Sequence, residues 1–81
     1  MKWLITKDLL DELDVRYGNY RGDPDKLLYE FRLLDDDGIV YYEGRSDDNS
    51  SEEAFDPLDW AEVHAGCTEI QYRNGNCWET L

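Results

Sequence analysis

Three aspartates followed by a glycine, Asp35-Asp36-Asp37-Gly38, form the stretch of this sequence that most resembles a metal-binding loop. Calcium takes carboxylate and carbonyl oxygens, and an EF-hand loop with Gly38 at its sixth position would place Asp35 and Asp37 at its third and fifth. The first position would then be Leu33, and the twelfth, which needs a glutamate, would be Gly44. The spacing therefore argues against a dedicated calcium site.

The other side chains that could do chemistry are two cysteines, one histidine and the remaining carboxylates. His64 and Cys67 form one H-x-x-C pair, but a zinc site needs a second pair of ligands, and none is present. The sequence also contains no Gly-rich phosphate loop and no nucleophile elbow. A domain of this length has little volume for a ligand pocket of roughly 300 Å³ or more. We therefore expect no metal, no cofactor and no enzymatic activity.

Charge is the most uneven property of the chain. The net charge is −12, with 20 acidic and 8 basic residues, and the segment 35–62 holds eleven of the acids with Arg45 as its one base. Aspartate and serine are common in turns, and acidic surfaces keep small proteins in solution, so solubility is one interpretation. The density of acids exceeds what turns require, so a functional acidic face is the other interpretation. Such a face repels nucleic acid and anionic membrane and attracts basic protein surfaces.

A partner-binding acidic face would use aromatic side chains among the carboxylates as buried anchors. One hypothesis is that the carboxylates imitate phosphates and occupy the groove of a nucleic-acid-binding protein. A second is that they neutralise a toxin or regulate another basic protein, and the alternative to both is a housekeeping domain whose acidity serves only solubility. The candidate partner-binding residues are Asp35, Asp36, Asp37, Tyr41, Glu43, Asp47, Asp48, Glu52, Glu53, Asp56, Asp59 and Trp60.

The compartment is predicted from what the sequence lacks. No apolar run approaches the ~20 residues of a membrane span, and the first residues do not resemble a signal peptide. We therefore expect a cytoplasmic protein in which Cys67 and Cys77 are reduced thiols, both partly buried.

The elements that must position the acids begin with a predicted hairpin, formed by residues 27–34 and 39–44 around an Asp37-Gly38 turn. Opposite charges on one face support this register, because like charges would be unfavourable there. The predicted pairs are Glu30 with Arg45, Arg32 with Glu43, Leu33 with Tyr42 and Leu34 with Tyr41. The residues expected in the core are Tyr29, Phe31, Leu33, Val40, Tyr42, Ile70 and Trp78.

The rest of the chain predicts a second hairpin and two short helices. Asn74-Gly75 indicates a turn that places Tyr72 beside either Trp78 or Cys77. Residues 2–5 predict an edge strand, residues 7–13 a short helix capped by Thr6, and residues 16–26 a loop. Residues 54–66 predict one or two helical turns that start at Asp56-Pro57 and end at Gly66. The expected fold is a single α+β domain spanning 1–81, with a mostly antiparallel sheet of four or five strands and one or two short helices.

The segments "FRLLDDDGIVYYEGRSDD" and "AGCTEIQYRNGNCWETL", together with "WLITKD", resemble a group of small bacterial proteins that share an acidic-turn hairpin, a "PLD" segment and a terminal Trp-containing strand. The resemblance implies a bacterial cytoplasmic protein and brings no activity with it. The charge density also resembles that of phage or plasmid inhibitors that imitate nucleic acid and of toxin-neutralising immunity proteins, which is an analogy of charge alone.

Overall fold

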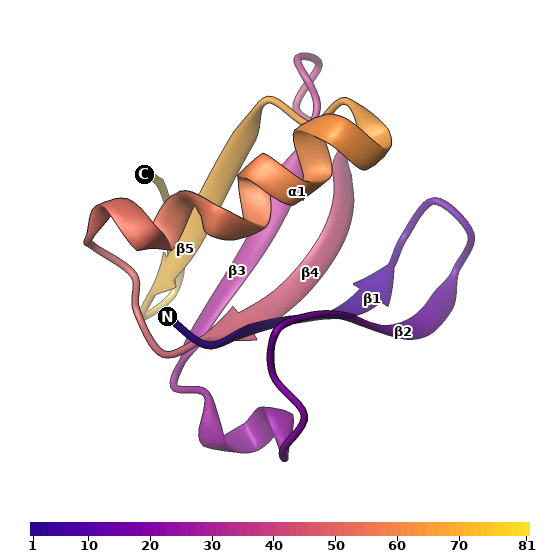
Figure 1. The fold of residues 1–81 in the computed structure, drawn as a ribbon. Coiled ribbons are helices and arrows are strands. Elements are labelled where there is room, and N and C mark those ends of the chain that lie inside the picture. The colour runs from indigo at the N-terminus through magenta and orange to yellow at the C-terminus, as the bar shows by residue number, and fades with distance from the viewer.

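A six-stranded antiparallel sheet with one α-helix across one face makes up the fold (Figure 1). The computed structural model describes all 81 residues. The strand order is β2-β1-β4-β3-β5-β6. The strands are β1 (Trp3–Asp8), β2 (Leu13–Gly18), β3 (Tyr29–Leu34), β4 (Val40–Ser46), β5 (Glu69–Asn74) and β6 (Cys77–Thr80). The helix α1 spans Asp56–Ala65, and two 3₁₀ turns are η1 (Pro24–Lys26) and η2 (Glu52–Phe55). The α+β class is confirmed, but the sheet has more strands than expected.

The extra strand arises where a helix was expected over residues 7–13, and that prediction was wrong. The chain turns after β1 and returns as β2, which begins at the last residue of the expected helix and ends inside the expected 16–26 loop. The Asp8 carboxylate accepts hydrogen bonds from the amides of Leu10 and Asp11, and Glu12 adopts a left-handed φ of 56°. A helix of two turns is marginal in water, whereas the hairpin gains ladder hydrogen bonds on both sides of β1.

The first strand lies inside the sheet rather than at its edge. It pairs with β2 on one side and with β4 on the other, and Trp3, Leu4 and Ile5 are buried in succession. A run of consecutive buried residues is typical of a strand covered on both faces, and this signal outweighs the flanking lysines. The register shifts between Ile5 and Lys7 against both neighbours, so Thr6 lies in a bulge.

The β3–β4 hairpin largely has the predicted register. Glu30 lies opposite Arg45, Arg32 opposite Glu43 and Leu33 opposite Tyr42, as expected. Leu34 pairs with Val40 instead of Tyr41, because Asp37-Gly38 is not the centre of a two-residue turn. The amide of Asp35 donates to the Ile39 carbonyl and that of Gly38 to the Asp35 carbonyl, with Gly38 at φ 78°. This arrangement is a three-residue loop in which the glycine takes the left-handed position.

The C-terminal hairpin has a register that neither expected alternative described. Asn74 pairs with Cys77, so Gly75 and Asn76 are the central residues of the turn and Tyr72 lies opposite Glu79. Gly75 is the first of these two central residues and has a left-handed φ of 62°, which glycine adopts without strain. The turn is therefore one residue later than predicted.

The core lies between the sheet and the helix. Phe31, Leu33, Tyr42 and Ile70 are buried as predicted, and they pack with residues from β1, η2 and α1, namely Trp3, Ile5, Ala54, Leu58 and Ala61. Tyr29 is half-buried and packs against this core, whereas Val40 and Trp78 are half-buried outside it, so their placement in the core was wrong. Trp78 lies opposite Arg73, and this pairing turns it to the opposite face of the sheet from Tyr72.

The helix α1 ends where the sequence predicted, but its ten residues form nearly three turns, more than the one or two expected. Gly66 has φ 73°, and its amide donates to the Ala61 and Glu62 carbonyls. The cysteines are both free thiols, but only Cys67 is buried, because Cys77 follows the β5–β6 turn on the last strand and is exposed. The expectation that both would be partly buried therefore fails for Cys77.

Candidate functional site

The acidic face forms on the segment 47–66, which we call the helical layer and which contains η2 and α1. It carries no lysine or arginine. Its carboxylates are Asp47, Asp48, Glu52, Glu53, Asp56, Asp59 and Glu62. Because α1 crosses the sheet from the η2 end to the end that holds the β3–β4 turn, these acids extend along one side of the molecule (Figure 1).

Three carboxylates of the helical layer have local structural partners. Asp48 accepts from the amides of Ser50 and Ser51 at 3.0 and 3.2 Å and from the Ser51 hydroxyl, and these hydrogen bonds lower its pKa. Asp47 accepts from the Lys2 amide at 2.9 Å, and Glu53 lies 3.0 Å from the amino group of Met1. These acids shape the loop that leads into η2.

The other four carboxylates of the helical layer make no side-chain hydrogen bond and no ion pair. They are Glu52, Asp56, Asp59 and Glu62. Asp56 and Asp59 lie in the first turn of α1, where the helix dipole favours negative charge. Glu62 lies in its last turn, where the dipole opposes negative charge. The helical layer therefore presents negative charge that the protein does not neutralise.

Trp60 provides the aromatic group within this acidic surface. It lies on α1 and is half-buried. Its ring stacks on those of Tyr17 of β2 and His64, with centroids 5.1 and 4.4 Å apart. The ring of Tyr42 meets it edge-on, with centroids 5.6 Å apart. The stack fixes the indole between α1 and β2. Sequence reasoning selected Trp60 but missed Tyr17 and His64. The i, i+4 spacing of Trp60 and His64 was a signal for the second.

The predicted site residues of the β3–β4 turn divide into structural and free carboxylates. Asp35 accepts from the amides of Asp37 and Ile39, each at 2.9 Å. These hydrogen bonds lower the pKa of Asp35, and the neighbouring Asp35 carboxylate raises that of Tyr41. Asp36 and Asp37 are exposed and make no side-chain hydrogen bond. Tyr41 is therefore part of the hairpin and not a free anchor.

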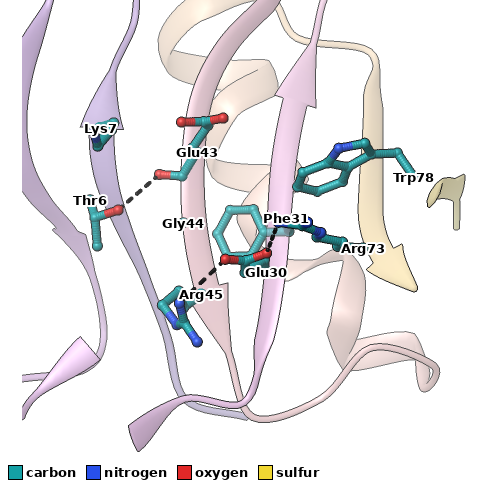
Figure 2. A pocket seen from close by; sticks show the side chains of 9 residues that line it. All are labelled: Thr6, Lys7, Glu30, Phe31, Glu43, Gly44, Arg45, Arg73 and Trp78. Atoms are coloured by element: carbon teal, nitrogen blue, oxygen red, sulfur yellow. Dashed lines mark hydrogen bonds and ion pairs between the residues drawn. The ribbon is translucent and has the colours of Figure 1, made fainter. Parts of the chain in front are cut away.

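Glu43 lies apart from the other candidates, on the face of the sheet that α1 leaves uncovered. We call this the open face (Figure 2). On the open face, carboxylates alternate with cations. The Glu30 carboxylate lies 3.5 Å from the Arg45 guanidinium and 3.0 Å from that of Arg73. Arg32 lies 4.4 Å from the ring centroid of Trp78 and donates to Gln71 at 2.7 Å. The sheet thus separates Glu43 from the helical layer, and sequence reasoning missed this second surface.

The sequence matches no protein-family model, no curated protein and no solved structure. None of the helices is both long and apolar enough to cross a membrane. No three side chains among His, Cys, Asp and Glu gather in a way that could hold a metal ion.

Proposed function

We propose that this protein is a non-catalytic binding module of the cytoplasm that engages a basic surface of a partner protein through its helical layer. The observation that carries the proposal is the set of four unpaired carboxylates, Glu52, Asp56, Asp59 and Glu62, in a segment that contains no lysine or arginine. Unlike Asp48, which local hydrogen bonds hold in its turn, these four carboxylates make no hydrogen bond within the protein.

The mechanism of such a module follows from its electrostatics. Uncompensated carboxylates steer a basic partner and raise the association rate, an effect that salt screens beyond about 10 Å. Tryptophan is enriched among the residues that contribute most to binding energy at protein interfaces. The rings of Tyr17 and His64 hold Trp60 in place within the acidic surface. Charge would bring the partner to the surface, and the edge of this stack would anchor it.

The partner class that we favour is a nucleic-acid-binding protein, whose groove already presents lysine and arginine to phosphates. Carboxylates arranged along one side of the module would take the place of those phosphates and inhibit nucleic-acid binding. A toxin or another regulated basic protein is the second candidate, because the rigid tryptophan among acids also suits a specific protein–protein contact.

The test uses two variants that remove the same amount of charge from different places. The helical-layer variant combines Glu52→Gln, Asp56→Asn, Asp59→Asn and Glu62→Gln. The control combines changes at the β1–β2 turn, β2 and η1: Asp11→Asn, Glu12→Gln, Asp14→Asn and Asp25→Asn. None of these eight side chains makes a hydrogen bond or ion pair, so both variants should fold. Each protein is immobilised, exposed to bacterial lysate at low and high salt, and its captured proteins are identified by mass spectrometry.

We expect the wild type and the control to capture the same basic protein at low salt, and the helical-layer variant to lose at least about tenfold of that capture. If the captured protein binds DNA or RNA, the wild type should displace that nucleic acid. Equal losses in both variants would show that only net charge matters, and the proposal would then be wrong.

A further inference from the structure

The open face contains a recess of about 240 Å³ near the middle of the sheet (Figure 2). Gly44 of β4 and Phe31 of β3 lie at its floor. A Cβ atom on Gly44 would lie 2.4 Å from the Leu4 carbonyl oxygen and 2.5 Å from Cζ of Phe31, so no other residue fits there without a shift of the backbone. The recess is therefore built on close-packed strands and has a rigid floor.

Cations dominate the rim of the recess. Arg45 and Arg73 share the single carboxylate of Glu30, so their two charges are only half neutralised. Lys7 is exposed and makes no ion pair, although Glu43 lies opposite it in the strand register. With these three cations and two carboxylates, the recess is locally positive in a chain whose net charge is −12.

Trp78 forms the wall of the recess on the β6 side (Figure 2). Arg32 lies 4.4 Å from the centroid of its ring and is itself held by a 2.7 Å hydrogen bond to Gln71. The guanidinium fixes the orientation of the indole through a cation–π contact. A flat apolar wall thus lies beside cationic groups that lack a full complement of anions.

We propose that this recess binds a small planar organic anion, a carboxylate carried on an aromatic or unsaturated ring. Lys7 and Arg45 would hold the carboxylate, because ammonium and guanidinium groups donate strong charge-assisted hydrogen bonds to it. The ring would lie over Gly44 and against Trp78. The volume corresponds to roughly eight water molecules in the liquid, which suits an ion the size of benzoate.

The proposal is tested by NMR titration of the ¹⁵N-labelled protein with benzoate, and with benzylammonium as a probe of similar size and opposite charge. Benzoate should move the amide signals of Thr6, Lys7, Gly44 and Arg45 and the indole N–H of Trp78. The shifts should saturate with a Kd on the order of 1 mM. Benzylammonium should leave these signals in place.

Variants then assign the contacts. Lys7→Gln and Arg45→Gln should each weaken benzoate binding at least about fivefold, whereas Arg21→Gln, which removes one cation from an exposed loop, should leave it unchanged. The helical-layer variant should also bind benzoate normally, so this test is independent of partner capture. Shifts that do not saturate, or equal shifts with benzylammonium, would overturn the proposal. The same shifts on raising the protein concentration alone would assign the recess to a second copy of the chain and would also overturn it.

Discussion

The helical layer and the open face are two surfaces of the same sheet that treat their carboxylates differently. On the open face, Glu30 bridges two arginines and Glu69 accepts from Gln71 and Thr80. On the helical layer, four carboxylates have no partner. Strand pairing places side chains of neighbouring strands side by side, so opposite charges stabilise the ladder there. A helix and a loop impose no such pairing, and charge in them stays available to other molecules.

The largest expected effect comes from the core residue that supports both surfaces. Phe31 is fully buried, its ring lies with its centroid 5.8 Å from that of Tyr72 in the core, and its strand lies at the floor of the open-face recess. Phe31→Ala should lower the free energy of unfolding by about 3–5 kcal/mol. That is a large part of the roughly 4–12 kcal/mol expected for a chain of this length. Urea denaturation followed by circular dichroism measures it, and a loss below about 1 kcal/mol would show that the two surfaces do not depend on this ring.

A smaller effect should differ in sign between the two surfaces. Glu30→Gln removes two partly exposed ion pairs and should cost about 0.5–2 kcal/mol. Glu62→Gln removes an unpaired charge from the last turn of α1 and should stabilise the protein by up to about 0.5 kcal/mol. Thermal unfolding at low salt compares the two variants. Equal destabilisation by both would contradict the prediction that carboxylates stabilise the open face but not the helical layer.

The pH dependence of stability should identify the helical-layer acids whose carboxylates stabilise the fold through hydrogen bonds. The hydrogen bonds from Ser50 and Ser51 lower the pKa of folded Asp48 below its ordinary value of 3.8. Its contribution is therefore fully present above that pH and is lost as the pH falls through the folded pKa. Asp48→Ala should unfold at a lower temperature than the wild type at pH 7, and the difference should shrink below pH 3.8. A difference that stays constant down to pH 2.5 would contradict this role.

The smallest expected effect on the fold concerns the two thiols. Burial raises the pKa of Cys67 to about 11, so at pH 8 it is a protonated thiol within the core. Cys77 is exposed on β6. A thiol reagent at pH 8 should therefore modify Cys77 rapidly and Cys67 only in denaturant, and modification of Cys77 should leave stability unchanged. Rapid reaction of both thiols in the native protein would contradict the burial of Cys67.

Local patterns in the sequence were sufficient for the elements whose signals agree with one another. The β3–β4 hairpin combines a turn signal with complementary cross-strand charges, and α1 combines an early proline with a final glycine. These features predicted the class, most of one register and one helix end. The charges that alternate along these two strands could also have revealed the open face. They belong to residues on one side of the hairpin, namely Glu30, Arg32, Glu43 and Arg45.

The N-terminal segment could not be predicted, because its structure depends on a distant strand. Leu9, Leu10 and Leu13 have helical spacing, yet all three are exposed near the end of the β1–β2 hairpin. The pairing of β1 with β4 decides the outcome, and no local pattern reports it. The candidate site was predicted in part for a related reason. The position of acids along the chain does not say on which side of the sheet they lie, and so Glu43 was grouped with the helical layer.

The arrangement of the strands also has a consequence for the order of folding. Three hairpins, β1–β2, β3–β4 and β5–β6, are each local, but they are joined by non-local pairings such as Trp3 with Ser46. Local hairpins form within microseconds, and closing the long loops between them is slower. The open-face recess takes Lys7 from the first hairpin, Arg45 from the second and Trp78 from the third. It can exist only after all three have docked, so its formation reports the assembly of the whole sheet and not of any one hairpin.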